Sequence, residues 1–155
     1  MEKIESVVIV HQHPKILLGM KKVRFGKGKY NGFGGGLEDG ESLMDCVIRE
    51  TYEEARIRIK NPEKMGEILF QFKLNERDHV VHFFRTSEFE GTPQESDEMK
   101  PEWFDIKDIP YDKMWADDKY WLPLLLSGKK FKGIFHFDEE LRISDHQLNE
   151  VFELE

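Results

Sequence analysis

The amino-acid sequence predicts a single α+β domain over residues 1–155. Short runs of β-branched and aromatic residues recur along the chain between turn signals, a pattern typical of a sheet of several strands. One amphipathic stretch without Pro or Gly, residues 43–57, predicts a helix of about four turns. A chain of 155 residues with 39% apolar content is long and apolar enough for one domain with a sizeable core, and this composition excludes a disordered chain.

The first elements form a predicted hairpin of strands 4–10 and 15–20 around His11-Gln12-His13-Pro14. His11 and His13 could share a strand face and bind a metal, but Pro14 and the lack of a third ligand favour a turn. A basic stretch over residues 21–29 follows. It is either a solvated loop or a loop that covers a phosphate-bearing substrate, and its glycines have neither P-loop nor dinucleotide-binding spacing.

A glycine-rich turn at residues 34–36 leads to the predicted helix, which begins after Ser42 with Asp45 as acidic partner. At 100° per residue, the predicted core face comprises Met44, Val47, Ile48, Thr51 and Ala55, and the predicted solvent face comprises Asp45, Arg49, Tyr52 and Arg56. A third sector carries Glu50, Glu53 and Glu54. Stacked like charges on a helix repel, and a hard divalent cation such as Mg²⁺ would relieve that repulsion. The alternative is a solvated acidic face with an Arg49–Glu53 ion pair.

The second half of the chain predicts strands at 65–74 and 79–86 around a turn at 75–78, and a short strand at 100–104. A short Leu-rich helix at 119–126 and an alternating strand at 131–137 follow. The acidic tail, 139–155, is expected to fray at its end.

Composition limits the cellular setting and the partners. Cys46 is the only cysteine, which excludes an intrachain disulfide and favours a reducing compartment, and we interpret it as a packing residue rather than a nucleophile. The N-terminus resembles no signal peptide and no apolar run is long enough to span a membrane, so we expect a cytoplasmic protein. The net charge of −8 opposes binding to a nucleic-acid polymer.

A specific motif links the glycine-rich turn to the helix. The residues Gly35, Glu41, Arg49, Glu50, Glu53, Glu54 and Ile57 match, in order and spacing, the Nudix box, G-x5-E-x7-R-E-U-x-E-E-x-G-U with U apolar. The chain therefore resembles the Nudix hydrolases. Two positions depart: Thr51 stands where an aliphatic residue is usual, and Arg56 stands where Gly is usual. Gly there permits a left-handed helix exit, which Arg adopts poorly.

The resemblance extends from about Val7 to Leu148 and is closest to the mammalian MutT homologues, the branch that hydrolyses oxidised purine nucleoside triphosphates. It implies an α/β/α sandwich with a mixed, curved sheet. The sequence does not determine the oligomeric state, for which a monomer is the default expectation. The resemblance also implies roles for particular residues. Asn31, Asp117 and Asp118 would hydrogen-bond the purine, Trp115 and Phe25 would pack on it, Lys21 would neighbour the phosphates, and Ser6 would line the pocket. Glu50, Glu53, Glu54, Glu98 and Gly34 would hold Mg²⁺, or Mn²⁺ in its place.

The chemistry of the Asp117-Asp118 pair agrees with that role. Adjacent carboxylates repel, and burial beside Trp115 would raise at least one pKa. A protonated carboxyl donates a hydrogen bond while an ionised one only accepts, so the pair could distinguish purine edges that differ in their donors. The alternative is that one of them caps the helix that follows. Asn31 likewise suits either a base edge or a turn before Gly32.

The reaction implied is hydrolysis of a modified purine nucleoside triphosphate to the monophosphate and pyrophosphate. The cation would polarise the phosphates and help to generate the attacking hydroxide, and Arg49 would orient a glutamate. Glu53 or Glu98 would be the base. The attacked phosphorus, the preferred purine and the choice of ribose or deoxyribose stay open. Rival interpretations are a Nudix hydrolase for another diphosphate, such as a dinucleoside polyphosphate or nucleotide sugar, and a non-catalytic nucleotide-binding module.

Overall fold

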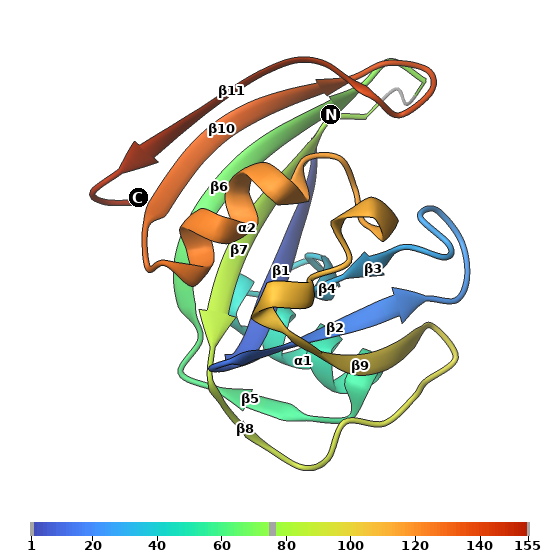
Figure 1. Ribbon diagram of the computed structural model, residues 1–155, viewed down its shortest axis with the longest axis vertical. Coiled ribbons are helices and arrows are strands. Elements are labelled where there is room, and N and C mark those ends of the chain that lie inside the picture. Colours follow the sequence, from blue (N-terminus) through green and yellow to red (C-terminus); the bar gives the residue numbers. More distant parts are fainter. Residues whose placement is uncertain (1, 75–76, 155) are drawn as a thin grey trace.

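The computed structural model describes residues 2–74 and 77–154, and its centre is a mixed nine-stranded sheet (Figure 1). The strands run in the order β11-β10-β6-β7-β1-β2-β3, with β4 paired to β1 and β9 paired to β2. Their bounds are β1 Lys3–Gln12, β2 Lys15–Lys21, β3 Tyr30–Asn31, β4 Phe33–Gly36, β6 Glu63–Phe72, β7 His79–Thr86, β9 Met99–Asp105, β10 Lys130–Phe137 and β11 Ile143–Val151. Strands β5 (Arg58–Lys60) and β8 (Glu88–Glu90) form a separate two-stranded sheet.

Two helices cover opposite faces of this sheet, α1 (Leu43–Ala55) and α2 (Asp118–Leu126). Successive side chains of β1 point to opposite faces, as the pleat requires. Val8 and Val10 therefore pack in one core with Val47 and Ala55 of α1. Ile9 packs in the other core with Trp121 and Leu122 of α2. The predicted α+β sandwich with a mixed sheet is confirmed, because β1–β7 and β6–β10 are parallel and the other ladders are antiparallel.

Helix α1 begins as the sequence predicts and ends two residues early. Ser42 Oγ accepts a hydrogen bond from the Asp45 backbone N–H at 3.1 Å. The helix stops at Ala55, and Arg56 adopts the left-handed conformation (φ 61°, ψ 25°) in which Gly is usual. Its N–H donates to the Tyr52 carbonyl, and its guanidinium lies 5.7 Å from the Tyr52 ring centroid. The helix exit of the box is therefore kept despite the substitution.

The predicted faces of α1 need correction at two places. Val47, Thr51 and Ala55 are buried as predicted, and the Thr51 hydroxyl donates to the Val47 carbonyl at 2.6 Å, so its polar group is satisfied inside the core. Met44, however, is exposed. Arg49 is not on a solvent face, because its guanidinium turns back to the carboxylates of Glu38 and Glu41 in the loop between β4 and α1.

One other prediction was wrong. The glycine-rich segment is strand β4, not a turn: Gly34 pairs with Val7 and Gly36 with Glu5 of β1. A Cβ on Gly34 would lie 1.8 Å from the Ser6 carbonyl oxygen, so only glycine allows the two strands to approach this closely. The sequence indicated no strand in the tail, whereas residues 143–151 form β11 along β10. Asn75 and Glu76 of the predicted 75–78 turn, and Glu155, lie outside the described residues.

Neither α1 nor α2 is long and apolar enough to cross a membrane, and no other helix of the described chain is.

Candidate active site

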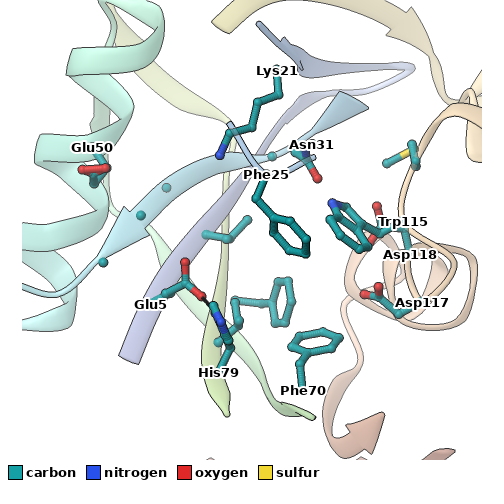
Figure 2. A pocket seen from close by; sticks show the side chains of 18 of the residues that line it. Glu5, Lys21, Phe25, Asn31, Glu50, Phe70, His79, Trp115, Asp117 and Asp118 are labelled. Carbon is teal, nitrogen blue, oxygen red and sulfur yellow. Dashed lines mark hydrogen bonds and ion pairs between the residues drawn. The ribbon is translucent and has the colours of Figure 1, made fainter. Parts of the chain in front are cut away.

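A cavity of ≈ 560 Å³ opens between the α2 face of the sheet, the loop that follows β2 and the segment that leads into α2 (Figure 2). Its wall includes residues from β1, β4, β6, β7 and β10. Two chemically different ends can be distinguished. One carries the carboxylates Glu50, Glu54 and Glu98, and the other carries Trp115, Asp117 and Asp118.

The first end contains two carboxylates from successive turns of α1. Glu54 is only 5% exposed, and its Oε1 accepts a hydrogen bond from the Gly34 N–H at 2.9 Å. Burial, reinforced by the charges of Glu50 and Glu98, raises the pKa of Glu54 to about 8. Burial also raises the pKa of Glu50, although Arg49 opposes it. Gly35 faces this pair, because a Cβ there would lie 2.0 Å from Glu50 Oε1.

Arg49 holds the outer side of this end. Its Nε and Nη2 atoms lie 2.7 and 2.9 Å from the two carboxylate oxygens of Glu41, an arrangement that favours a planar guanidinium. The Arg49 hydrogen bond lowers the pKa of Glu41 to about 2. The Nη1 atom reaches Glu50 at 2.9 Å and Glu53 at 3.2 Å. Glu53 is 52% exposed and is not among the cavity-lining residues, so the three box glutamates are not equivalent.

The donor set fits a hard divalent cation. Within residues 2–74 and 77–154, no three His, Cys, Asp or Glu side chains converge as a ready-made metal site, and His11 and His13 form none with a third ligand. The Arg49 guanidinium donates hydrogen bonds to Glu50 and Glu53, and the Gly34 N–H donates one to Glu54. Nevertheless Glu50 and Glu98 both raise the pKa of Glu54 by charge repulsion. A cation with oxygen ligands would relieve this repulsion, so the carboxylates of Glu50, Glu54 and Glu98 suit such an ion chemically.

The basic stretch supplies cations near the same carboxylates. Lys21 and Arg24 line the cavity. Arg24 Nη1 lies 3.2 Å from Glu98 Oε1, and Lys22 Nζ lies 2.6 Å from Glu95 Oε2. These pairs join the loop after β2 to the segment before β9, so the loop is held over the cavity rather than standing alone in solvent.

The opposite end of the cavity contains the Asp117-Asp118 pair, and both residues are buried. Burial raises the pKa of both carboxyls, and for Asp118 the charge of Asp117 adds to it. Asp117 Oδ2 accepts a hydrogen bond from Trp121 Nε1 at 2.8 Å. The Asp117 side chain makes no capping hydrogen bond to α2, which speaks against the capping interpretation.

Aromatic rings line the space between the acid pair and the loop. The Phe25 ring lies 5.0 Å from Trp115 and 5.8 Å from Phe72, measured between centroids. Lys29 Nζ lies 5.4 Å from the Trp115 ring centroid. Asn31 lines the cavity as well, and its side-chain amide is 3.4 Å from the Lys29 carbonyl oxygen. A flat aromatic ligand could therefore stack here and present its polar edge to the carboxyls.

The structure does not bring Ser6 to this cavity. Ser6 is fully buried, and its hydroxyl donates to Cys46 Sγ at 3.1 Å, beneath α1. Because strand side chains alternate, the neighbours Glu5 and Val7 face the cavity instead.

Several cavity residues had no signal in the sequence, namely Glu5, Trp121, His79 and Phe137. The predicted strand 65–74 includes Phe70 and Phe72, but nothing local indicated that these rings line a cavity. Glu5 and His79 lie 74 residues apart in sequence, and only the pairing of β1 with β7 brings them together.

The comparison with protein families identifies the chain. The NUDIX domain model matches residues 3–125, which include the box, helix α1, all but the last residue of α2 and the carboxylate end of the cavity. The chain belongs to the Nudix family. It is 45% identical to the oxidized purine nucleoside triphosphate hydrolase of Danio rerio over 98% of this chain and 97% of that protein. It is 42% identical to the protein of the same name from Mus musculus, over 96% of each.

Solved Nudix structures agree in fold. A mutator MutT protein from Bacillus halodurans superimposes with a TM-score of 0.84 at 30% identity, covering 95% of this chain and 97% of that one.

Proposed function

We propose that this protein hydrolyses oxidised or otherwise modified purine nucleoside triphosphates to the monophosphate and pyrophosphate. The observation that carries the proposal is the buried acid pair Asp117-Asp118 at one end of a cavity whose other end is lined by box carboxylates. Relatives that align over nearly the whole chain are named oxidized purine nucleoside triphosphate hydrolases, which supports the same substrate class.

The acid pair would read the base. Because burial and mutual repulsion raise the pKa of Asp118, this carboxyl can keep its proton where an exposed one would lose it. The pair then offers a donor beside an acceptor. Guanine presents an acceptor at N7, and its 8-oxo form carries a hydrogen there, so an acceptor carboxyl opposite N7 would favour the oxidised base. Trp115 and Phe25 would stack on the rings, and Asn31 would bond the opposite edge.

The other end would position the triphosphate. Lys21 and Arg24 would neutralise phosphate oxygens, and Arg49 would hold the Glu50 carboxylate in place. A divalent cation, Mg²⁺ or Mn²⁺, held by Glu50, Glu53, Glu54, Glu98 and the Gly34 carbonyl, would polarise the phosphates and activate water. Glu98 lines the cavity and Glu53 does not, which favours Glu98 as the base that takes the proton from water.

The same proposal includes the setting of the protein. We propose one domain over residues 1–155, since β10 and β11, outside the matched range, extend the same sheet. A cytoplasmic monomer that acts on free nucleotides accords with the single cysteine and with the net charge of −8, which disfavours nucleic-acid polymers.

A nucleotide panel with Mg²⁺, resolved by chromatography, tests the proposal. It should contain 8-oxo-dGTP, 2-hydroxy-dATP, O6-methyl-dGTP, dGTP, a diadenosine polyphosphate and ADP-ribose. We expect the highest kcat/KM for modified purine triphosphates, with monophosphate and pyrophosphate as products, and a loss of preference in Asp117→Asn. Preference for another diphosphate would contradict the role of the acid pair. Binding without turnover would favour a nucleotide-binding module.

A further inference from the structure

A glutamate–histidine pair faces the cavity beside the groups described above. Glu5 of β1 and His79 of β7 lie on the same face of two parallel strands, and Glu5 Oε1 lies 2.6 Å from His79 Nδ1 (Figure 2). The two side chains are 21% and 16% exposed, and both line the cavity. The proposed function assigns neither residue a role in binding the base or the phosphates.

The pair lies between the two ends of the cavity. On one side, the Phe72 ring is 5.4 Å from the His79 ring and 6.2 Å from Trp115, so the pair adjoins the aromatic wall of the base end. On the other side, Glu5 is in register with Gly36, whose neighbour Gly35 packs against the Glu50 carboxylate. In a nucleotide whose base contacts the acid pair and whose phosphates reach the box carboxylates, the sugar would lie beside Glu5.

The chemistry of Glu5 restricts what it can bind. Burial opposes ionisation, but the hydrogen bond to His79 and the positive charges of Lys3, His79 and Lys21 outweigh it and lower the pKa of Glu5. An ionised carboxylate only accepts hydrogen bonds and repels phosphate. Oε1 is engaged by His79, whereas Oε2 lies 3.7 Å from Lys3 Nζ, too far for a hydrogen bond, and keeps its capacity to accept one.

The sugar is the part of a nucleotide that satisfies these restrictions. Between the base and the phosphates, the hydrogen-bond donors of a nucleoside triphosphate are the hydroxyl groups of its sugar. Carboxylates bind ribose hydroxyls in other nucleotide sites, for example in dinucleotide-binding folds. We propose that Glu5 binds a sugar hydroxyl of the substrate and that His79 is the positioning residue that fixes its carboxylate. This inference rests on the proposed function and extends it to the selection of the sugar.

The test compares three oxidised substrates that differ only in the sugar: 8-oxo-GTP, 8-oxo-dGTP and the 2′,3′-dideoxy form. In the wild type, loss of the recognised hydroxyl should lower kcat/KM about tenfold, since a hydrogen bond to a charged group is broken. A decrease in kcat/KM from 8-oxo-GTP to 8-oxo-dGTP identifies the 2′ hydroxyl as the one bound, and a decrease from 8-oxo-dGTP to the dideoxy form identifies the 3′ hydroxyl. In Glu5→Ala the substrates should be hydrolysed with equal kcat/KM within about twofold.

Further variants separate recognition from stability. Glu5→Gln keeps the shape and a neutral acceptor, so it should retain part of the discrimination, and it serves as the test where Glu5→Ala does not fold. His79→Phe keeps an aromatic ring beside Phe72 but cannot hold the carboxylate, so it should also reduce the discrimination. Glu67→Ala is a matched control, because Glu67 faces His82 at 3.4 Å on neighbouring strands and lies outside the cavity lining. It should discriminate as the wild type does.

The outcomes distinguish this inference from the proposed function. If the wild type hydrolyses oxidised triphosphates but treats the three sugars alike, or if Glu5→Ala and Glu5→Gln discriminate as fully as the wild type, the inference is overturned and the proposed function stands. If the wild type hydrolyses none of the three, the proposed function is overturned and the sugar inference falls with it.

Discussion

Replacing Glu54 by glutamine should change how the stability of the metal-free protein depends on pH. Glu54 is 5% exposed and its pKa is raised from 4.5 to about 8, so its carboxyl is protonated in the folded protein where the unfolded chain has already lost the proton. The folded state therefore binds more protons between pH 4.5 and pH 8. The free energy of unfolding must fall as pH rises through this range.

The magnitude follows from the two pKa values. Each pH unit between the unfolded and the folded pKa is worth about 1.4 kcal/mol, so Glu54 alone should lower the unfolding free energy by about 2.5 kcal/mol between pH 5 and pH 7. The full effect above pH 8 is roughly 5 kcal/mol. Glutamine has no proton to lose, and its amide oxygen can still accept the hydrogen bond from Gly34. Glu54→Gln should therefore be more stable than the wild type at pH 8 and similar to it at pH 5.

Denaturant unfolding in the presence of a chelator at pH 5, 6, 7 and 8 measures this difference. The difference between the two proteins isolates Glu54, because both contain the buried acids Asp117 and Asp118, whose contribution to the pH dependence of the unfolding free energy cancels. Glu53→Gln is the matched control, because Glu53 is half exposed and outside the cavity, and it should follow the wild type. Parallel curves for wild type and Glu54→Gln would refute the reasoning. Added Mg²⁺ should stabilise the wild type at pH 8 more than it stabilises Glu54→Gln.

Three other changes should separate the roles of the two cavity ends. In the wild type, we expect KM for an oxidised purine nucleotide to increase with pH as the Asp118 carboxyl loses its proton, and Asp118→Asn should abolish this increase. An equal increase in both proteins, measured by steady-state kinetics from pH 6 to 9.5, would contradict a donor role for Asp118. Phe25→Ala should raise KM about tenfold through lost stacking while changing the unfolding free energy by less than about 1 kcal/mol, since Phe25 is 54% exposed; thermal denaturation beside kinetics checks both. Arg49→Lys should lower kcat about ten- to hundredfold with a smaller change in KM, because lysine cannot bind both carboxylate oxygens of Glu41 and also hydrogen-bond Glu50. A decrease in kcat matched by an equal increase in KM would argue against a positioning role for Arg49.

The residues that the sequence predicted correctly have local causes. The helix start follows from Ser42 and Asp45, whose hydrogen bond spans three residues, and the buried positions Val47, Thr51 and Ala55 follow from helical periodicity. The strands β1, β2, β6, β7 and β10 follow from runs of β-branched and aromatic residues. The box glutamates share one sector of α1 for the same reason, since their spacing alone determines where they lie around the helix.

What the tertiary structure decided depends on contacts between distant segments. Spacing placed Glu53 and Glu54 together, but packing buried Glu54 against Gly34 and left Glu53 with Arg49 at the surface. Ser6 and Glu5 are neighbours in sequence, yet the pleat of β1 turns one beneath α1 and the other into the cavity.

The partners of the cavity residues were also beyond the reach of local patterns. The pairing of Glu5 with His79 depends on which strand adjoins β1, and no local pattern determines the order of strands in a sheet. The sequence by itself thus determined the family, most of the elements and the chemistry of the box. The tertiary structure determined which of those side chains share a cavity, because burial and strand pairing are set by the whole chain.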